Sequence, residues 1–258
     1  MALSLKVLGC SSATPTSTRY PSAFLLKADN KKDRFLIDCG EGTQILLRKM
    51  GIRMGTISRI FISHLHGDHF LGLVGFVFSQ NLLGRTEELH IYAHKPLENI
   101  LKIHMKLEQI NLSYPLTFHV IKKNDKNKVL YADKDMEIRC FPLVHGNMPT
   151  HGFVFRHTKA SFAYCSDTLY SETILPYIEG VDLLYHEATF MENLSHAAAE
   201  KYHATAKEAA LIALKAGVKQ LLIGHYSARY TNTKPLEDEA KSVFPNSIAA
   251  CEGLTIDF

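Results

Sequence analysis

Short apolar runs recur along the whole chain, and many of them end abruptly in histidine, aspartate or glutamate. Helical patterns lie between these runs, and the alternation is found in both halves of the sequence. Such alternation predicts an α/β fold of packed sheets covered by helices on their outer faces. The runs that read most clearly as strands are LSLKVLG, RFLID, RIFISH, ELHIYAH, CFPLVH, FAYCSD, LLYHE and LLIGH.

The helical patterns carry recognisable start and stop signals. Residues 68–84 are long and apolar enough for a mostly buried helix, and Pro96 begins a second helical pattern. The segment 205–217 has a capping box of Thr205 and Glu208. A hairpin is expected around the polar turn 29–33. No boundary divides the chain, so residues 1–258 are expected to form a single domain.

Composition excludes several classes of protein. The 258 residues are 46% hydrophobic and 21% charged, which is ordinary for a globular protein and excludes disorder and a coiled coil. The net charge of +3 makes any nucleic-acid surface a local patch. The one charge run, 122–128, reads as a solvated turn, with a phosphate-binding patch as the alternative.

No segment is apolar enough to span a bilayer, so a cytoplasmic protein without membrane contact is expected. Five widely spaced cysteines without a CxxC pair predict buried thiols.

The segment Ser63–His69 (SHLHGDH) concentrates three histidines and an aspartate directly after a predicted strand. Imidazole and carboxylate groups are good ligands for zinc. His64 and His66 project to one side of an extended segment, because side chains alternate with period two. Gly67 allows a tight turn that brings Asp68 and His69 to a second position. This spacing supplies ligands for two adjacent metals.

Further ligand-type residues stand where other apolar runs end, and strand ends collect functional residues in layered α/β folds. These are Asp38, His145, Asp167, His186, Glu187 and His225. Their joint occurrence predicts a dinuclear site at one edge of the sheets. Asp167 is the natural bridge between two metals about 3.5–4 Å apart that hold a hydroxide between them. Such a site hydrolyses esters, amides or phosphodiesters.

At these residues the chain resembles the metallo-β-lactamase superfamily and, within it, the ribonuclease Z branch. The superfamily resemblance rests on HxHxDH followed in order by His145, Asp167 and His225, and it covers the whole chain. The narrower resemblance rests on VLGCSSATPTSTR, FLIDCGEGTQ, YCSDT, HEATF, HATAKEAA and GHYSARY. It implies an αββα sandwich, with two mixed sheets flanked by helices, and a tRNA 3′-processing endoribonuclease that uses a hydroxide held by two metals.

The resemblance also implies roles for individual residues. Two Zn²⁺ ions per chain are expected, with Mn²⁺ as a substitute. One zinc would take His64, His66 and His145 as ligands. The other would take Asp68, His69 and His225, with Asp167 bridging both.

Other residues would act beside the metals. Asp68 would also orient or deprotonate the attacking water, and His203, positioned by Glu187, would protonate the leaving 3′ oxygen. Asp38 would fix the tautomer of a ligand histidine.

Some residues keep two interpretations. Ser227 and Arg229 are candidates for contacts to a substrate phosphate, although Arg229 could instead pair structurally with a carboxylate. His186 is either a buried hydrogen-bonded side chain or part of the site. His151 follows no ligand pattern, but it lies six residues after His145.

The chain departs from the ribonuclease Z pattern in one place. These enzymes carry a flexible arm that grips tRNA, inserted between the histidine and bridging-aspartate motifs. Only 21 residues separate His145 from Asp167, and a tight hairpin connection at 156–160 is predicted instead of the arm.

This departure leaves the substrate and partners open. Precursor tRNA is the expected RNA partner and a homodimer the expected assembly, with a heteromeric partner as an alternative. The competing functions are a zinc phosphodiesterase for small or unstructured diesters, another hydrolase of this fold that cleaves lactones or thioesters, and a metal-stabilised binding protein.

Overall fold

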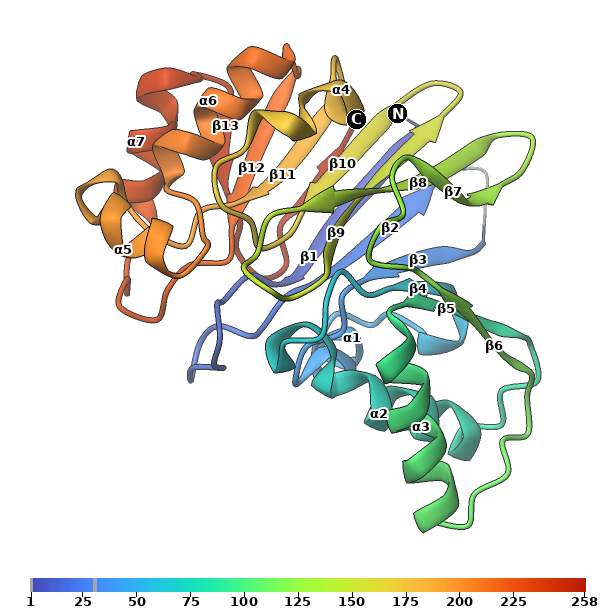
Figure 1. The fold of residues 1–258 in the computed structure, drawn as a ribbon. Helices are drawn as coiled ribbons and strands as arrows, with labels where there is room; N and C mark the ends of the chain where they lie inside the picture. The colour runs from blue at the N-terminus through green and yellow to red at the C-terminus, as the bar shows by residue number, and fades with distance from the viewer. Residues whose placement is uncertain (1, 30–31) are drawn as a thin grey trace.

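Two seven-stranded sheets lie face to face in the computed structural model, which describes residues 2–29 and 32–258 (Figure 1). The first sheet has the order β14-β1-β2-β3-β4-β5-β6 and the second the order β13-β12-β11-β10-β9-β8-β7. The strands of the first sheet are β1 (Leu3–Gly9), β2 (Ala23–Ala28), β3 (Arg34–Ile37), β4 (Ile57–Phe61), β5 (Leu89–Ala93), β6 (Leu116–Val120) and β14 (Thr255–Asp257). Those of the second are β7 (Lys128–Ala132), β8 (Met136–Leu143), β9 (Thr150–His157), β10 (Ser161–Cys165), β11 (Leu183–Glu187), β12 (Gln220–Gly224) and β13 (Ser247–Ala249).

Both sheets are mixed, and helices cover their outer faces. Strands β3 to β6 pair in parallel, whereas β1, β2 and β14 are antiparallel to their neighbours. In the second sheet β10 to β13 are parallel and β7 to β10 antiparallel. The helices are α1 (Thr43–Lys49), α2 (Gly67–Leu82), α3 (Lys95–Leu107), α4 (Leu175–Ile178), α5 (Ser195–Glu200), α6 (Ala206–Ala216) and α7 (Lys234–Val243), with short 3-10 turns at Met54–Thr56, Glu172–Ile174 and Glu192–Leu194. The first three helices lie on the first sheet and α4 to α7 beside the second (Figure 1), which is the predicted αββα sandwich.

Aromatic side chains from both sheets fill the space between them. The Phe61 ring on β4 meets the Phe155 ring on β9 edge-on, with centroids 5.5 Å apart. The Phe24 ring on β2 lies 4.5 Å from that of Tyr185 on β11. These rings belong to one buried cluster that includes strands of both sheets. Each fully buried aromatic ring contributes about 1.5–3 kcal/mol relative to exposure, so this shared core joins the two sheets.

Most elements lie where the sequence predicts them. Helix α6 has the capping box of Thr205 and Glu208, and it ends at Gly217 in the left-handed conformation, with φ 61°. The hairpin of β2 and β3 is antiparallel as predicted, although residues 30 and 31 of its turn lie outside the described part of the chain. The β9–β10 hairpin is confirmed as well, and Arg156 pairs there with Ser161.

The charged segment 122–128 makes a connection that the sequence does not reveal. The strands on either side of it, β6 and β7, are the edge strands of different sheets. The segment therefore carries the chain from one sheet to the other.

No sequence signal predicted α1, β13 or β14. The two strands have three residues each and depend on neighbours remote in sequence, since β14 pairs with β1 at the opposite terminus.

No helix within residues 2–29 and 32–258 is long and apolar enough to cross a membrane.

Candidate metal centre

The HxHxDH segment changes from extended chain to helix within a few residues. Strand β4 ends at Phe61, the backbone at His66 is still extended (φ −76°, ψ 146°), and α2 begins at Gly67. His64 and His66 therefore project to the same side, and His64 Nε2 lies 3.1 Å from His66 Nδ1. Asp68 follows in the first turn of α2, at the positive end of the helix dipole.

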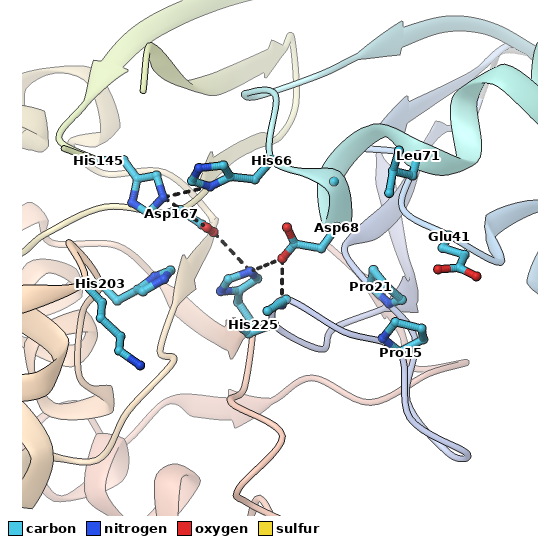
Figure 2. A pocket seen from close by; sticks show the side chains of 14 residues that line it. Pro15, Pro21, Glu41, His66, Asp68, Leu71, His145, Asp167, His203 and His225 are labelled. Atoms are coloured by element: carbon cyan, nitrogen blue, oxygen red, sulfur yellow. Dashed lines mark hydrogen bonds and ion pairs between the residues drawn. The ribbon is translucent and has the colours of Figure 1, made fainter. Parts of the chain in front are cut away.

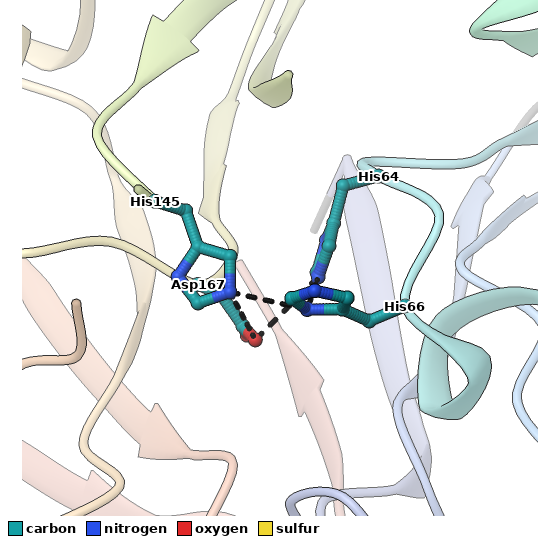
Figure 3. Close-up of side chains that lie close together, drawn as sticks. All are labelled: His64, His66, His145 and Asp167. Atoms are coloured by element: carbon teal, nitrogen blue, oxygen red, sulfur yellow. Dashed lines mark hydrogen bonds and ion pairs between the residues drawn. The ribbon is translucent and has the colours of Figure 1, made fainter. Parts of the chain in front are cut away.

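The first cluster combines this segment with two strands of the second sheet (Figure 3). His145 follows β8 and Asp167 follows β10. His145 Nε2 lies 3.1 Å from His66 Nδ1 and 3.7 Å from Asp167 Oδ2. His64 Nε2 lies 3.6 Å from the same carboxylate oxygen. One nitrogen of each ring and one oxygen of Asp167 therefore face a common point.

The second cluster shares Asp167 with the first (Figure 2). His225 follows β12, and its Nε2 lies 3.2 Å from Asp68 Oδ2 and 3.3 Å from Asp167 Oδ1. His69 Nε2 lies 3.5 Å from Asp68 Oδ2 and 3.4 Å from Asp167 Oδ1. The two oxygens of Asp167 therefore face different clusters, as a bridging carboxylate requires.

The chemistry of these donors fits divalent metal ions. His69 Nε2 and Asp167 Oδ1 are buried and have no hydrogen-bond partner. Two unpaired buried polar atoms are costly, and a metal between them would satisfy both. The 3.1 Å separations of ring nitrogens also match tetrahedral coordination, in which zinc ligands at 2.0–2.1 Å lie about 3.3 Å from one another.

Several ligand histidines are held by a hydrogen bond from the nitrogen that points away from the clusters. His69 Nδ1 donates to Asp38 Oδ2 at 2.7 Å, and His145 Nδ1 donates to the carbonyl oxygen of Tyr202 at 2.8 Å. His225 Nδ1 donates to Thr189 Oγ1 at 2.9 Å. Such bonds fix the tautomer that leaves Nε2 available to a metal.

Among the groups that hold the ligand histidines, the Asp38 carboxylate accepts the most hydrogen bonds. Its side chain accepts the backbone N–H of Ser63 at 2.8 Å and the Tyr164 hydroxyl at 2.6 Å, in addition to His69. Since Asp38 follows β3 and Tyr164 lies on β10, the carboxylate also joins the two sheets beneath the clusters. Asp38 and His225 both adopt left-handed backbone conformations, with φ 54° and 62°. Such a conformation is uncommon outside glycine and is typical of functional sites.

Glu187 and His203 form a second buried unit beside the clusters. Glu187, at the end of β11, is wholly buried, and its Oε1 accepts His203 Nδ1 at 2.8 Å. Thr189 donates to the other carboxylate oxygen of Glu187 through its hydroxyl at 2.8 Å. Burial lowers the pKa of His203, but the Glu187 carboxylate outweighs that effect and raises the pKa to about 9. The Glu187 carboxylate therefore favours the protonated ring of His203, and this residue lines the cavity at the metal ligands.

The carboxylates of the site remain ionised despite burial. Burial raises the pKa of Asp167, but the imidazoles of His225, His69 and His64 outweigh it and hold that pKa well below its ordinary value. Burial likewise raises the pKa of Glu187, and His203 brings it below its ordinary value. Both groups are thus suited to bind cations.

The clusters open into a cavity of about 290 Å³. Its wall includes ligands of both clusters and His203, together with Pro15 and Glu41 (Figure 2). A smaller cavity of about 200 Å³ adjoins it at His203. The smaller cavity is lined by both candidate phosphate contacts, Ser227 and Arg229. The two cavities share lining residues, among them Lys201 and His203, so Arg229 lies close to the space that the metal ligands line.

The contacts of Arg229 differ from those of an arginine that pairs structurally with a carboxylate. Its Nε donates to Ser227 Oγ at 3.0 Å, and its guanidinium carbon lies 4.9 Å above the Phe190 ring. No ion pair to Arg229 occurs within the described ranges. The guanidinium is therefore free to meet a phosphate.

Two histidines whose roles the sequence left open lie outside the clusters. His186 is buried, and its Nδ1 donates to the carbonyl oxygen of Glu187 at 2.7 Å. This matches the structural interpretation of His186. His151 is also buried, and its Nε2 donates to the carbonyl oxygen of Asp125 at 3.1 Å.

Sequence reasoning missed several residues that support the site. Ser63 and Thr189 bond to ligand histidines, and Ser166 lies 2.9 Å from the Ser63 hydroxyl. Each stands inside a motif that already carried a predicted residue, which is the signal that could have found them. Lys201 lines both cavities near His203, and no sequence signal singled it out.

Comparison with known proteins identifies relatives of the whole chain. The chain is 39% identical to ribonuclease Z of Bacteroides fragilis and 38% identical to that of Porphyromonas gingivalis. These alignments cover 98% and 99%, respectively, of both partners. A family model described as anti-Pycsar protein Apyc1 matches residues 3–244.

Solved structures agree with these relatives. Human tRNase Z, short form, superposes with a TM-score of 0.86 at 26% identity, over 98% of both chains. The metallo-β-lactamase fold protein YhfI from Bacillus subtilis, at 21% identity, gives 0.83 over 99% of both chains and shares the fold.

Proposed function

The chain belongs to the ribonuclease Z family and, by its family-model match, to the Apyc1 family, and from this premise we propose that it is a metal-dependent endoribonuclease that cleaves precursor tRNA at its 3′ end. The observation that carries the proposal is the pair of ligand clusters sharing Asp167, with Glu187 and His203 beside them. The clusters suit hydrolysis of a phosphodiester, and the adjacent acid suits a leaving group that must be protonated.

We propose two Zn²⁺ ions per chain, with Mn²⁺ as a substitute. His64, His66 and His145 would hold one ion, and Asp68, His69 and His225 the other. Asp167 would bridge the two. Bound metal ions of this kind lower the pKa of a water molecule and stabilise the charge that develops on a phosphate.

Asp68 serves two purposes in this proposal. One oxygen, Oδ2, accepts the backbone N–H of Ala13 at 2.8 Å and approaches His225, which fixes the plane of the carboxylate. The other oxygen is left to accept a proton from the attacking water. A carboxylate held in this way orients the water and removes its proton without having to reorganise.

His203 supplies the proton for the leaving group. The ribose 3′ oxygen leaves as a poor, strongly basic group unless it is protonated as the bond breaks. Glu187 holds the ring through Nδ1, so Nε2 carries the proton toward the cavity. His203 also lies near enough to Asp167 and His225 to act as a metal ligand. The proposal keeps His203 as the acid because Asp68, His69, His225 and Asp167 already supply the four ligands of a tetrahedral site.

Ser227 and Arg229 would contact an RNA phosphate next to the cleaved one. They line the cavity that adjoins His203, which is the side where the proposed acid would place the leaving nucleotide. The guanidinium rests on Phe190 and has no carboxylate partner, so it can bind a phosphate with two hydrogen bonds.

We propose that the tRNA-binding arm is missing from this chain. Strands β9 and β10 are joined by only Thr158–Ala160. The alignments to the curated relatives run over 301 and 305 positions although this chain has 258 residues. The relatives therefore contain residues that have no counterpart here. Binding of structured RNA would then depend on phosphate contacts made by the sandwich itself or by a partner protein.

The short β9–β10 connection also favours a second candidate function. A zinc phosphodiesterase for small or unstructured diesters would need every residue of the metal clusters but no arm.

The homodimer, the single domain over 1–258 and the cytoplasmic location stay predictions. The core shared by the two sheets supports the single domain.

One experiment separates the two functions. Zinc-loaded protein is given a precursor tRNA with a 3′ trailer and, separately, a chromogenic nitrophenyl phosphodiester. Cleavage directly after the discriminator nucleotide supports tRNA maturation. Hydrolysis of the chromogenic diester without tRNA cleavage would establish the second function instead.

The Asp68→Ala variant tests the chemistry common to both functions. Loss of the carboxylate removes a metal ligand and the proton acceptor together, so we expect no measurable hydrolysis of either substrate. Circular dichroism checks that the variant is folded. Substantial turnover by folded Asp68→Ala protein would refute the dinuclear mechanism.

A further inference from the structure

Another cavity lies behind the HxHxDH segment and has no part in the chemistry described above. It encloses about 430 Å³, and its wall is almost wholly apolar. Leu65 enters this wall because side chains alternate along the extended segment, so Leu65 points away from the side to which His64 and His66 project. Other apolar members of the wall are Pro96, Val120, Ile121, Met148 and Pro149.

Lysines surround this apolar wall, so we call it the lysine-rimmed cavity. Lys95, Lys122 and Lys123 line it, and all three side chains are exposed. Lys95 pairs with Glu98. Lys122 and Lys123 have no ion-pair partner within the described residues. An apolar cavity with unpaired cations at its edge fits a ligand that is apolar on one side and anionic on the other.

The turn that carries these two lysines is held in place from below. Asp125 accepts the backbone N–H of Lys122 at 2.8 Å and the Lys128 ammonium at 2.8 Å. The carbonyl oxygen of Asp125 accepts His151 Nε2, and His151 Nδ1 lies 3.3 Å from His94 Nε2. The backbone of the turn is thus fixed while Lys122 and Lys123 remain free to bind, which lowers the entropic cost of holding a ligand.

A groove shares wall residues with both the lysine-rimmed cavity and the metal centre. A hollow of about 450 Å³ runs over the loop 146–149, with Met148 and Pro149 common to both spaces. Its walls also include the metal-ligand candidates His66 and His145. Lys201 and Tyr202, next to His203, line the same hollow.

The position of His203 assigns a direction to an RNA strand in this groove. This residue protonates the 3′ oxygen of the nucleotide before the cleaved bond, so that nucleotide lies near His203. The nucleotides after the cleaved bond remain attached to the phosphate at the metal centre. They can leave it along the loop 146–149, toward the lysine-rimmed cavity.

We propose that the lysine-rimmed cavity binds an unstacked nucleotide of the single-stranded RNA that follows the cleaved bond. The base enters the apolar wall, and the flanking phosphates meet Lys122 and Lys123. Single-stranded RNA suits such a site because its bases can be splayed out and buried individually. The inference rests on the proposed ribonuclease function and adds to it a subsite for the 3′ trailer.

Direct binding tests the subsite without requiring turnover. Oligoribonucleotides of one, two and three residues, each with a 5′ phosphate and a 3′ fluorescein, mimic the released trailer. Fluorescence anisotropy gives their affinity for the zinc-loaded protein, and a gel confirms that each remains intact. We expect affinity to rise about tenfold when the added residue reaches the cavity, because removing the apolar surface of one base from water contributes an increase of this order.

Two variants assign the increase in affinity to the cavity. The double variant Lys122→Ala/Lys123→Ala should abolish most of it, and the dependence of log affinity on log salt should become shallower by about one for each phosphate that is no longer neutralised. The matched control, Lys126→Ala/Lys134→Ala, removes two exposed lysines that do not line the cavity and should bind as the unmodified protein does. An abasic residue at the critical position should remove the base contribution alone.

The outcomes separate this inference from the proposed function. The subsite would be refuted if affinity did not rise with oligonucleotide length. It would also be refuted if the Lys122→Ala/Lys123→Ala variant kept the same rise in affinity as the control variant. Cleavage of precursor tRNA is measured in parallel. If that cleavage is absent, the proposed function is wrong, but the binding series still decides whether the cavity holds a nucleotide.

Discussion

The roles of Glu187 and His203 predict a substrate-dependent effect of one substitution. His203→Ala should lower the rate of RNA cleavage by about 10²–10⁴-fold, the usual contribution of a positioned general acid. Hydrolysis of a nitrophenyl diester should fall far less, because nitrophenolate leaves without a proton. The measurement is kcat for both substrates with the same zinc-loaded preparation.

A matched control for this prediction exists on α5. His196 is an exposed histidine whose side chain is 89% accessible and lies outside the clusters. His196→Ala should leave both rates unchanged. Equal losses on both substrates in His203→Ala would show that His203 is not the acid.

Asp38 allows a test of whether hydrogen bonds to the ligand histidines affect zinc binding. Asp38→Asn removes the charge that His69 bonds to but keeps the shape, and asparagine tolerates the left-handed backbone at this position. We expect the affinity for zinc to fall about 10–100-fold, the range typical of such positioning groups. Competition with a chromogenic chelator measures it.

Asp33→Asn is the control for the loss of one negative charge. Asp33 is 56% exposed and lies 3.8 Å from Arg59, so its removal should not affect zinc. Unchanged zinc affinity in Asp38→Asn would mean that the charge of the group that His69 bonds to does not contribute to zinc binding.

At the scale of elements, the capping box that begins α6 stands two residues after His203. Thr205 accepts the backbone N–H of Glu208 at 3.1 Å, and the Glu208 side chain accepts that of Thr205 at 2.8 Å. Thr205→Ala removes this cap and should lower the free energy of unfolding by about 1 kcal/mol. Urea denaturation measures the loss.

Helix α7 supplies the control for this substitution. Thr233 occupies the same N-cap position there, but its side chain makes no capping hydrogen bond. Thr233→Ala should therefore change the free energy of unfolding by only a few tenths of a kcal/mol. Similar losses in the two variants would contradict the importance of the α6 cap.

At the scale of the whole molecule, the short β9–β10 connection is expected to limit tRNA affinity. A ribonuclease Z arm grafted between Thr158 and Ala160 would leave the paired strand residues Arg156 and Ser161 in register. We expect the graft to tighten binding of precursor tRNA, because it adds phosphate contacts spread over a surface. Filter binding at fixed salt gives the change in Kd.

A flexible glycine–serine loop of the same length is the control for the graft. It should leave both tRNA binding and hydrolysis of the chromogenic diester unchanged. Unchanged tRNA affinity with the genuine arm would mean that the missing arm is not what limits binding.

The fold class and the metal-ligand candidates follow from the amino-acid sequence alone. Strand and helix periods arise from local geometry, so the alternation of apolar runs and helices indicated the layered fold. The HxHxDH segment is also local, because an extended pair of histidines followed by a turn at Gly67 needs no distant contact. The positions of His145, Asp167 and His225 could be read for the same reason, since each marks the end of a strand.

How these pieces meet is a property of the tertiary structure. The hydrogen bond between Tyr164 and Asp38 joins different sheets, and nothing in either local sequence specifies the other. The segment 122–128 read as a simple turn, but it crosses between the sheets and brings two lysines to an apolar cavity behind the metal ligands. The physical reason is the same in each case. Local sequence sets backbone period and side-chain direction, whereas contacts between distant segments depend on how the two sheets pack over their shared core.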